Sequence, residues 1–438
     1  MGPGSTAKPG RVADVNARLV DPASGLDTPG ALLAEGGTIA ELGPGLFADG
    51  VPDGIASVDC QRHCLAPGLV DMRVQLREPG EEHKETFKTA SLAAAAGGGT
   101  TMVALPNTSP VIDEVAVVEF GARRAREVKR VKIFCYAAVT RGLEGRQMTE
   151  IGLLAEAGAV AFTDGVRSVA DALVLRRALS YARTFGQLIV QHAEEPSLAA
   201  DGVMNEGELA SRLGLPGIPA AAEAIMVARD LRLVELTGGR YHAAHLSTAA
   251  AIDAVRRAKA RGLAVTADTA PHYFALNENA VGDYRTFAKV SPPLRGEADR
   301  AAVVDGLADG TIDIIASDHA PQDQESKRLP FAQAEFGVIG LETLLALSLE
   351  LYHNGRLSLL ACLAALTSRP AALLALPAGR LSPGAPADLL LFDPDRPWRV
   401  DEARFRSKCK NSPFDGRPVQ GVVLRTVVDG RTVYQAED

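Results

Sequence analysis

The stretch "CLAPGLVDMRVQLREPG", from Cys64 to Gly80, opens the long middle part of the chain. Its apolar run predicts a strand over residues 69–76, and polar residues, Arg73, Gln75 and Arg77, come at the end of that run. The segments after Gly80 decide which kind of sheet this strand enters.

Seven further strand-like runs come after it, and most of them precede an Ala/Leu-rich amphipathic segment such as "DALVLRRALSYART". They are "TTMVALPNT", "KIFCYAAVT", "AVAFTDG", "QLIVQHAE", "RYHAAHLST", "LAVTADTAP" and "IDIIASDHAP". Alternation of strand and helix predicts a parallel sheet, and eight strands predict an α/β fold of the closed (β/α)8 TIM-barrel type. A doubly wound open sheet is the alternative. It is disfavoured because no Gly-x-Gly-x-x-Gly follows the first strand, and the glycines of "AAAAGGGTTM" are predicted to end a helix.

The two ends of the chain have a different pattern, with short apolar runs interrupted by Gly and Pro. Near the C-terminus, Asp429-Gly430 stands between two β-rich runs, which is typical of a hairpin turn. We therefore expect a small β-sandwich-like domain built from residues 1–65 and 378–438, and a barrel over residues 66–377.

Composition excludes several classes of function. The chain has 438 residues and a net charge of −8 without a long basic run, so nucleic acid and anionic membranes are poor partners. No apolar run is long enough to cross a bilayer, and the N-terminus lacks a secretory signal, which favours the cytoplasm. Five scattered cysteines do not form a disulfide framework, and the close pair Cys60 and Cys64 lacks further ligands for a zinc finger.

Polar residues gather where the predicted strands end, the rim at which TIM barrels carry their chemistry. Besides the three residues of the first strand, these are Asn107, Asp164, His192, His245 and Asp318. Imidazole and carboxylate groups suit zinc, which lowers the pKa of a bound water to near neutrality. Asp318 would then take and return the proton of that water.

The chain resembles the dihydroorotases, cyclic amide hydrolases of pyrimidine biosynthesis within the amidohydrolase superfamily. The resemblance extends almost from end to end and rests on motifs that include "APGLVD", "LREPGEEHKETFKTASLAAAAGGGTTMVALPNTSP", "QHAEE", "AHLSTA", "KVSPPLR", "IIASDHAP" and "FGVIGLET". It implies a metal-dependent barrel with a small β domain. It also implies site roles: zinc ligands at His192 and His245, Asp164 between two metal positions, Asp318 as general acid/base, and substrate contacts at Arg77 and Asn107.

Four positions depart from the family pattern. Arg73 and Gln75 replace a pair of metal-binding histidines, while Gln322 and Ser291 replace a histidine and an asparagine at positions expected to contact substrate. A guanidinium has no lone pair to donate to a metal, and its charge repels a cation. A Gln carbonyl oxygen is a weak zinc donor. We therefore expect the first metal position to be lost, leaving at most one zinc ion on Asp164, His192 and His245.

These departures leave three hypotheses. The first is a catalytically impaired dihydroorotase-like subunit, because some homologues without metal ligands assemble with aspartate transcarbamoylase. The second is an active one-zinc dihydroorotase that converts dihydroorotate and carbamoyl aspartate reversibly. The third is a related amidohydrolase for a hydantoin or allantoin. The resemblance also leaves a homodimer open.

Other residues have plainer interpretations. His272 is interpreted as a packing or substrate-proximal residue. His319 directly follows Asp318 on a strand, so its side chain is predicted to point to the opposite face. The basic residues of "GARRAREVKRVK" are interpreted as the solvated face of a helix.

Overall fold

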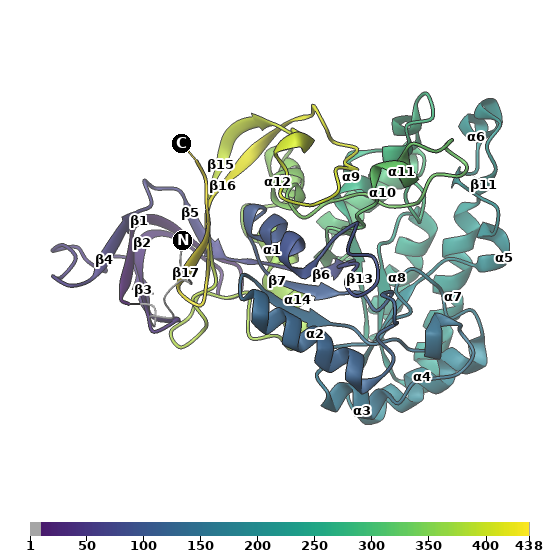
Figure 1. Ribbon diagram of the computed structural model, residues 1–438, viewed down its shortest axis with the longest axis horizontal. Coiled ribbons are helices and arrows are strands. Elements are labelled where there is room, and N and C mark those ends of the chain that lie inside the picture. Colours follow the sequence, from purple (N-terminus) through teal and green to yellow (C-terminus); the bar gives the residue numbers. More distant parts are fainter. Residues whose placement is uncertain (1–9, 438) are drawn as a thin grey trace.

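A closed barrel of parallel strands forms the main body of the protein in the computed structural model, which describes residues 10–437 (Figure 1). Its strands are β6 (Leu69–Val74), β7 (Gly99–Ala104), β8 (Lys132–Cys135), β9 (Leu188–His192), β12 (Arg240–Ala244), β13 (Val265–Thr269) and β14 (Ile314–Ile315). The segment around Phe162 supplies the eighth position through parallel bridges to Ala137 and Ile189. A parallel bridge between Val74 and His319 closes the ring. The predicted fold class is therefore confirmed.

Helices surround this ring of strands. The longer ones are α1 (Phe87–Ala96), α2 (Val115–Val128), α4 (Ala172–Thr184), α7 (Ala220–Thr237), α8 (Ala249–Ala260), α10 (Glu297–Ala308), α12 (Leu344–His353) and α13 (Leu359–Leu366). Short helices α3 (Ile151–Glu156), α5 (Pro196–Ala199), α6 (Glu208–Leu213), α9 (Pro271–Ala275), α11 (Gln324–Lys327) and α14 (Ser368–Leu373) and short strands β10 (Met204–Asn205) and β11 (Gly217–Ile218) lie in the connections. Several helices begin at a side-chain cap, because the first backbone N–H groups of a helix need an acceptor. Thr86 caps α1, Asp171 caps α4 and Thr248 caps α8.

The two ends of the chain form one connected sheet beside the barrel (Figure 1). Its order is β17 (Arg431–Gln435), β16 (Pro418–Val428), β15 (Leu389–Arg399), β5 (Cys64–Pro67), β1 (Val12–Asp21), β2 (Leu26–Glu35) and β3 (Thr38–Gly43), and β4 (Ala56–Asp59) pairs with β1. The predicted hairpin joins β16 to β17, with Asp429 at φ 47° and Gly430 at φ 70°. Strand β5 pairs with both β1 and β15, so it unites the two ends of the chain.

The Gly-rich stretch after α1 ends that helix, as predicted, with Gly97 at its C-cap. A Cβ atom on Gly97 would lie 2.0 Å from the backbone oxygen of Leu341, so a side chain does not fit there. Gly98 follows with φ +87°, a conformation that glycine adopts without steric cost. The stretch thus turns the chain tightly from α1 into β7.

Among residues 10–437, no helix combines the length and the apolar character needed to span a membrane.

Candidate functional site

Arg73 lies inside the mouth of the barrel and is almost completely buried, with 2% of its side chain exposed. Its Nε donates to Oδ1 of Asp318 across 2.7 Å, and one terminal nitrogen donates to the carbonyl oxygen of Gly165 across 3.1 Å. Strand β6 supplies the guanidinium, and the segment after β14 supplies the carboxylate. The barrel therefore brings together two residues 245 positions apart in the sequence.

Imidazole groups continue this chain of contacts. Nδ1 of His245 lies 3.2 Å from Oδ2 of Asp318, and Nε2 of His245 lies 2.8 Å from Nδ1 of His192. His272 approaches the same carboxylate, with Nε2 3.8 Å from Oδ2. His245 and Asp318 both have left-handed backbone angles, φ 39° and φ 51°, which turn their side chains at the ends of the strands. Asp318 is thus the centre of a buried cluster. One guanidinium hydrogen-bonds its carboxylate, and two imidazoles lie 3.2 Å and 3.8 Å from the same carboxylate oxygen.

Burial and charge set the protonation of this cluster. Burial, aided by the Arg73 charge, lowers the pKa of His245 to about 4. Burial also lowers the pKa of His272 to about 4. For Asp318, burial alone would raise the pKa, but the hydrogen bond from the His245 ring and the charge of the Arg73 guanidinium outweigh it and hold that pKa well below its usual range. At neutral pH the cluster therefore contains a carboxylate paired with a guanidinium, beside the neutral imidazoles of His245 and His272.

Asp164 faces a different partner. Its Oδ1 accepts from the backbone N–H of Thr140 at 2.9 Å, and its Oδ2 accepts from the Thr140 hydroxyl. Burial raises the pKa of Asp164 to about 6, although the Thr140 hydrogen bonds act in the opposite direction. The structure therefore places this residue at the mouth of the barrel but ties its carboxylate to the segment after β8.

The two residues that the family resemblance assigns to substrate carboxylate recognition are bonded within the protein. Arg77 donates to the carbonyl oxygen of Pro321 at 3.2 Å and to Oε2 of Glu81 at 2.9 Å. Nδ2 of Asn107 donates to Oε1 of Gln75 at 3.1 Å. Gln75, which stands where the family has a histidine, thus accepts a hydrogen bond from Asn107, a predicted substrate contact.

The other two departures from the family pattern also have internal partners. Oγ of Ser291 donates to Oε2 of Glu194 at 3.3 Å. Nε2 of Gln322 donates to the carbonyl oxygen of Phe336 at 2.8 Å, while its Oε1 is buried without a partner among the described residues. Within residues 10–437, neither side chain has a hydrogen bond to Asp318.

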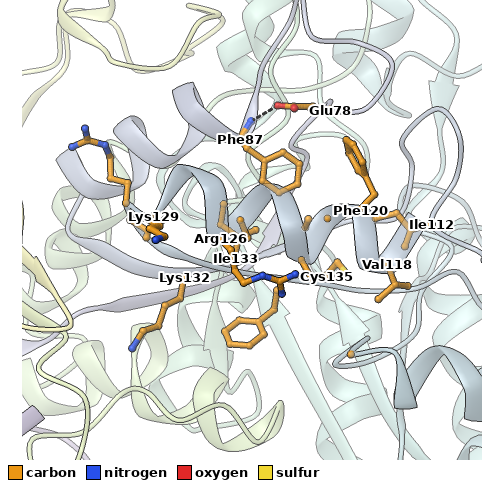
Figure 2. Close-up of a pocket in the computed structure, with 18 of the residues that line it drawn as sticks. Glu78, Phe87, Ile112, Val118, Phe120, Arg126, Lys129, Lys132, Ile133 and Cys135 are labelled. Carbon is orange, nitrogen blue, oxygen red and sulfur yellow. Dashed lines mark hydrogen bonds between the residues drawn. The ribbon is translucent and has the colours of Figure 1, made fainter. Parts of the chain in front are cut away.

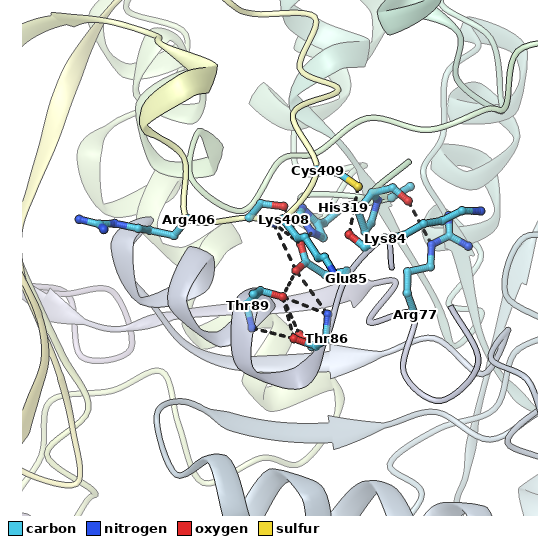
Figure 3. A network of polar contacts seen from close by, with 12 residues as sticks. Arg77, Lys84, Glu85, Thr86, Thr89, His319, Arg406, Lys408 and Cys409 are labelled. Carbon is cyan, nitrogen blue, oxygen red and sulfur yellow. Dashed lines mark hydrogen bonds and ion pairs between the residues drawn. The ribbon is translucent and has the colours of Figure 1, made fainter. Parts of the chain in front are cut away.

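A second polar network holds the loop that carries Arg77 (Figure 3). Glu85 is fully buried and accepts from Oγ of Ser407 at 2.5 Å, and Nε2 of His319 lies 3.5 Å from its Oε2. His319 therefore points toward the β6–α1 loop and away from Asp318, as predicted. The same network joins this loop to the segment around Lys408, whose N–H faces Glu85 at 3.3 Å.

The sequence reasoning missed Glu194 as a member of the site. Its Oε2 lies 3.7 Å from Nε2 of His192 and accepts from Ser291. Its position two residues after His192 in "QHAEE" was the available signal, because alternate residues of an extended segment share a face. On this side, His192 and Glu194 line a cavity of about 600 Å³ together with Arg146 and Arg167.

The residues at the mouth do not fit a metal ion as they stand. Within residues 10–437, no group of three or more His, Cys, Asp and Glu is arranged to hold one. Two imidazole nitrogens bound tetrahedrally to one zinc ion would lie about 3.3 Å apart. Those of His192 and His245 are 2.8 Å apart, the distance of a direct hydrogen bond, and the Asp164 carboxylate is engaged by Thr140. Arg73 brings a fixed cation into the same space.

Comparisons with known proteins agree on one group of enzymes. A family model described as dihydro-orotase-like matches residues 62–251, and an amidohydrolase family model matches residues 218–434. The chain is 50% identical over 432 residues to a dihydroorotase of Anaplasma phagocytophilum (strain HZ), covering 97% of this chain and 96% of the relative. A dihydroorotase of Desulforapulum autotrophicum is 48% identical over 421 residues, with 96% of this chain and 98% of the relative covered.

Solved structures show the same fold. The L-hydantoinase from Arthrobacter aurescens has a TM-score of 0.86 and 26% identity, covering 98% of this chain and 96% of that one. The dihydropyrimidinase from Brevibacillus agri NCHU1002 has a TM-score of 0.84 at 22% identity, with 97% and 95% covered.

Proposed function

The chain belongs to the dihydroorotase family of the amidohydrolases, and we propose that it is a catalytically impaired subunit in which Arg73 replaces a metal ion. Members of this family act in pyrimidine biosynthesis and are generally metal-dependent. The observation that carries the proposal is the ion pair of 2.7 Å between Arg73 and Asp318 inside the barrel. Asp318 would be the general acid/base of an active relative, and here its carboxylate is held by a permanent cation.

Two physical consequences support a loss of activity. A carboxylate whose pKa is held well below its usual range is a poor proton acceptor near neutral pH, where a general base works best with a pKa close to the pH. A guanidinium stabilises negative charge but cannot lower the pKa of a bound water as a zinc ion does. The site therefore has neither a good base nor a source of hydroxide.

The predicted substrate contacts support the same proposal. Arg77 and Asn107 would have to leave Glu81 and Gln75 before binding a substrate carboxylate. Breaking the charge-assisted Arg77–Glu81 bond and the neutral Asn107–Gln75 bond costs free energy, and a preformed binding site would not have this cost.

The direct test is a measurement of zinc content and of dihydroorotate turnover on the purified full chain, after incubation with zinc. We expect no bound zinc and no turnover above the uncatalysed rate. The active one-zinc dihydroorotase is the alternative, and turnover of about 1 s⁻¹ or more, a normal enzymatic rate, would establish it and overturn our proposal. A hydantoin is tested in the same assay. Turnover of the hydantoin without turnover of dihydroorotate would favour a related cyclic amidohydrolase over a dihydroorotase.

A gain-of-function variant makes the test sharper. In Arg73→His/Gln75→His the cation that pairs with Asp318 is removed, and an imidazole stands at both replaced positions. We expect this variant to bind zinc, as measured by elemental analysis, whereas Arg256→His, a change at an exposed arginine, should not. A double variant that stays metal-free in zinc buffer would show that Arg73 is not what excludes the ion.

As a subunit, the chain would act by assembling with aspartate transcarbamoylase, the partner that the family resemblance implies. Size-exclusion chromatography of a mixture of the two purified proteins tests this part. We expect one peak that contains both chains, and separate elution at micromolar concentration would contradict it.

A further inference from the structure

Helix α2 covers strand β8 incompletely and leaves a cavity of about 440 Å³ beneath it. Only Val118 of its fourteen residues is buried, although the first half of the helix is rich in valine. The volume lies within the range of about 300–1,000 Å³ that is typical of small-molecule pockets. The cavity is separate from the barrel mouth, because none of its lining residues belongs to the cluster around Asp318.

The cavity has an apolar end and a basic end (Figure 2). Ile112, Val118 and Phe120 lie toward one end, and Phe87 of α1 lies over the middle. Arg126, Lys129 and Lys132 lie toward the other end. This polarity follows the sequence of α2, in which the apolar "VAVVEFG" precedes the basic "ARRAREV".

Two of the basic side chains are available to a ligand. Lys132 is engaged, because its Nζ lies 2.7 Å from Asp388 and 2.8 Å from Asp429. Across the described part of the chain, the side chains of Arg126 and Lys129 have neither a hydrogen-bond nor an ion-pair partner. Basic residues at the C-terminal end of a helix complement its dipole, and here they also line one end of the cavity.

We propose that this cavity binds an amphipathic carboxylate of the fatty-acid type. The hydrocarbon chain would lie between α2 and β8 at the apolar end, and the carboxylate would lie between Arg126 and Lys129. Hydrocarbon burial supplies the affinity, and the two cations select an anionic head over a neutral one. This site is independent of the proposed function of the barrel mouth.

The test is calorimetric titration of the full chain with hexanoate, octanoate and decanoate, each below its micelle concentration. We expect the affinity to increase about three- to fourfold for each added methylene, because each one leaves water. Decanol, which has the same chain without a charge, should bind at least tenfold more weakly than decanoate. Affinities that do not change with chain length, or equal affinities of decanoate and decanol, would overturn the proposal.

Variants locate the ligand. Gly121 lines the cavity, and a Cβ atom added there meets no heavy atom within 4 Å. Gly121→Leu should therefore fold, because leucine is the better helix former, and should weaken decanoate binding more than tenfold by occupying the cavity. Arg126→Glu/Lys129→Glu should weaken decanoate more than tenfold and leave decanol unchanged.

Arg176→Glu/Arg177→Glu is the matched control, since it makes the same change of charge at two exposed positions on α4. It should bind decanoate like the unchanged protein. The melting temperature of each variant shows whether it is folded. Full decanoate affinity in a folded Gly121→Leu protein would place the ligand elsewhere and overturn the assignment.

Discussion

The two sides of the barrel mouth differ in what they contribute. The side built from β9, β12 and β14 carries His192, His245 and Asp318, all of the types found in metal sites. The side that includes β6 carries Arg73, which has no lone pair for a metal ion, and Gln75, whose carbonyl oxygen is a weak donor. Yet the two sides fit each other, because the guanidinium of the second pairs with the carboxylate of the first. One buried cation therefore joins the acid–base residues of both sides into a single cluster.

The largest expected effect comes from removing that cation. In Arg73→Met, the carboxylate of Asp318 stays buried and loses its ionic partner, so we expect a loss of about 3–5 kcal/mol in the free energy of unfolding. Urea denaturation at pH 7 measures it. Adding Asp318→Asn should restore most of the loss, because the uncompensated charge is then gone.

A surface ion pair provides the control for this prediction. Arg256 and Asp309 are 2.8 Å apart, with 42% and 44% of their side chains exposed. Arg256→Met should cost less than about 1 kcal/mol, since water screens such pairs. If Arg73→Met costs no more than Arg256→Met, the two sides of the mouth are not coupled in the way that their geometry indicates.

Much of this arrangement could be predicted from the sequence, and the part that could not has a physical reason. The barrel follows from strand periodicity. The position of Asp318 follows from the rule that the functional residues of such barrels lie at the C-terminal ends of the strands. The hydrogen-bond partner of Asp164 could not be predicted from the sequence, because the packing of neighbouring segments decides whether its carboxylate turns toward Thr140. Arg123 and Arg126 of α2 are exposed, as interpreted, whereas Arg124 is partly buried and pairs with Glu78. The cavity beside them depends on how closely the helix packs on β8.

The histidine side of the mouth should make stability sensitive to acid. Burial lowers the pKa of His272 to about 4, whereas in the unfolded chain it is near 6.5. Between these two values the unfolded chain binds the additional proton, so the contribution of His272 to stability is complete above pH 6.5 and is lost as the pH falls toward 4. His272→Asn cannot take up the proton. Relative to this variant, the unchanged protein should lose roughly 3 kcal/mol between pH 7 and pH 4.

Urea denaturation of both proteins at several pH values measures this difference. If the His272→Asn protein loses as much free energy of unfolding between pH 7 and pH 4 as the unchanged protein, the acid sensitivity comes from other groups.

The smallest expected effect concerns Gln75, the second replaced position, which directly follows β6. Its Oε1 accepts from Nδ2 of Asn107 at 3.1 Å in a partly buried contact, and neither group carries a charge. A neutral hydrogen bond contributes about 1 kcal/mol, far less than a buried ion pair whose partner is removed. Gln75→Ala, Asn107→Ala and the double variant form a thermodynamic cycle, from which urea denaturation should give a coupling energy of about 1 kcal/mol. A coupling as large as that between Arg73 and Asp318 would mean that both replaced positions, Arg73 and Gln75, and not the charged one alone, hold the mouth of the barrel together.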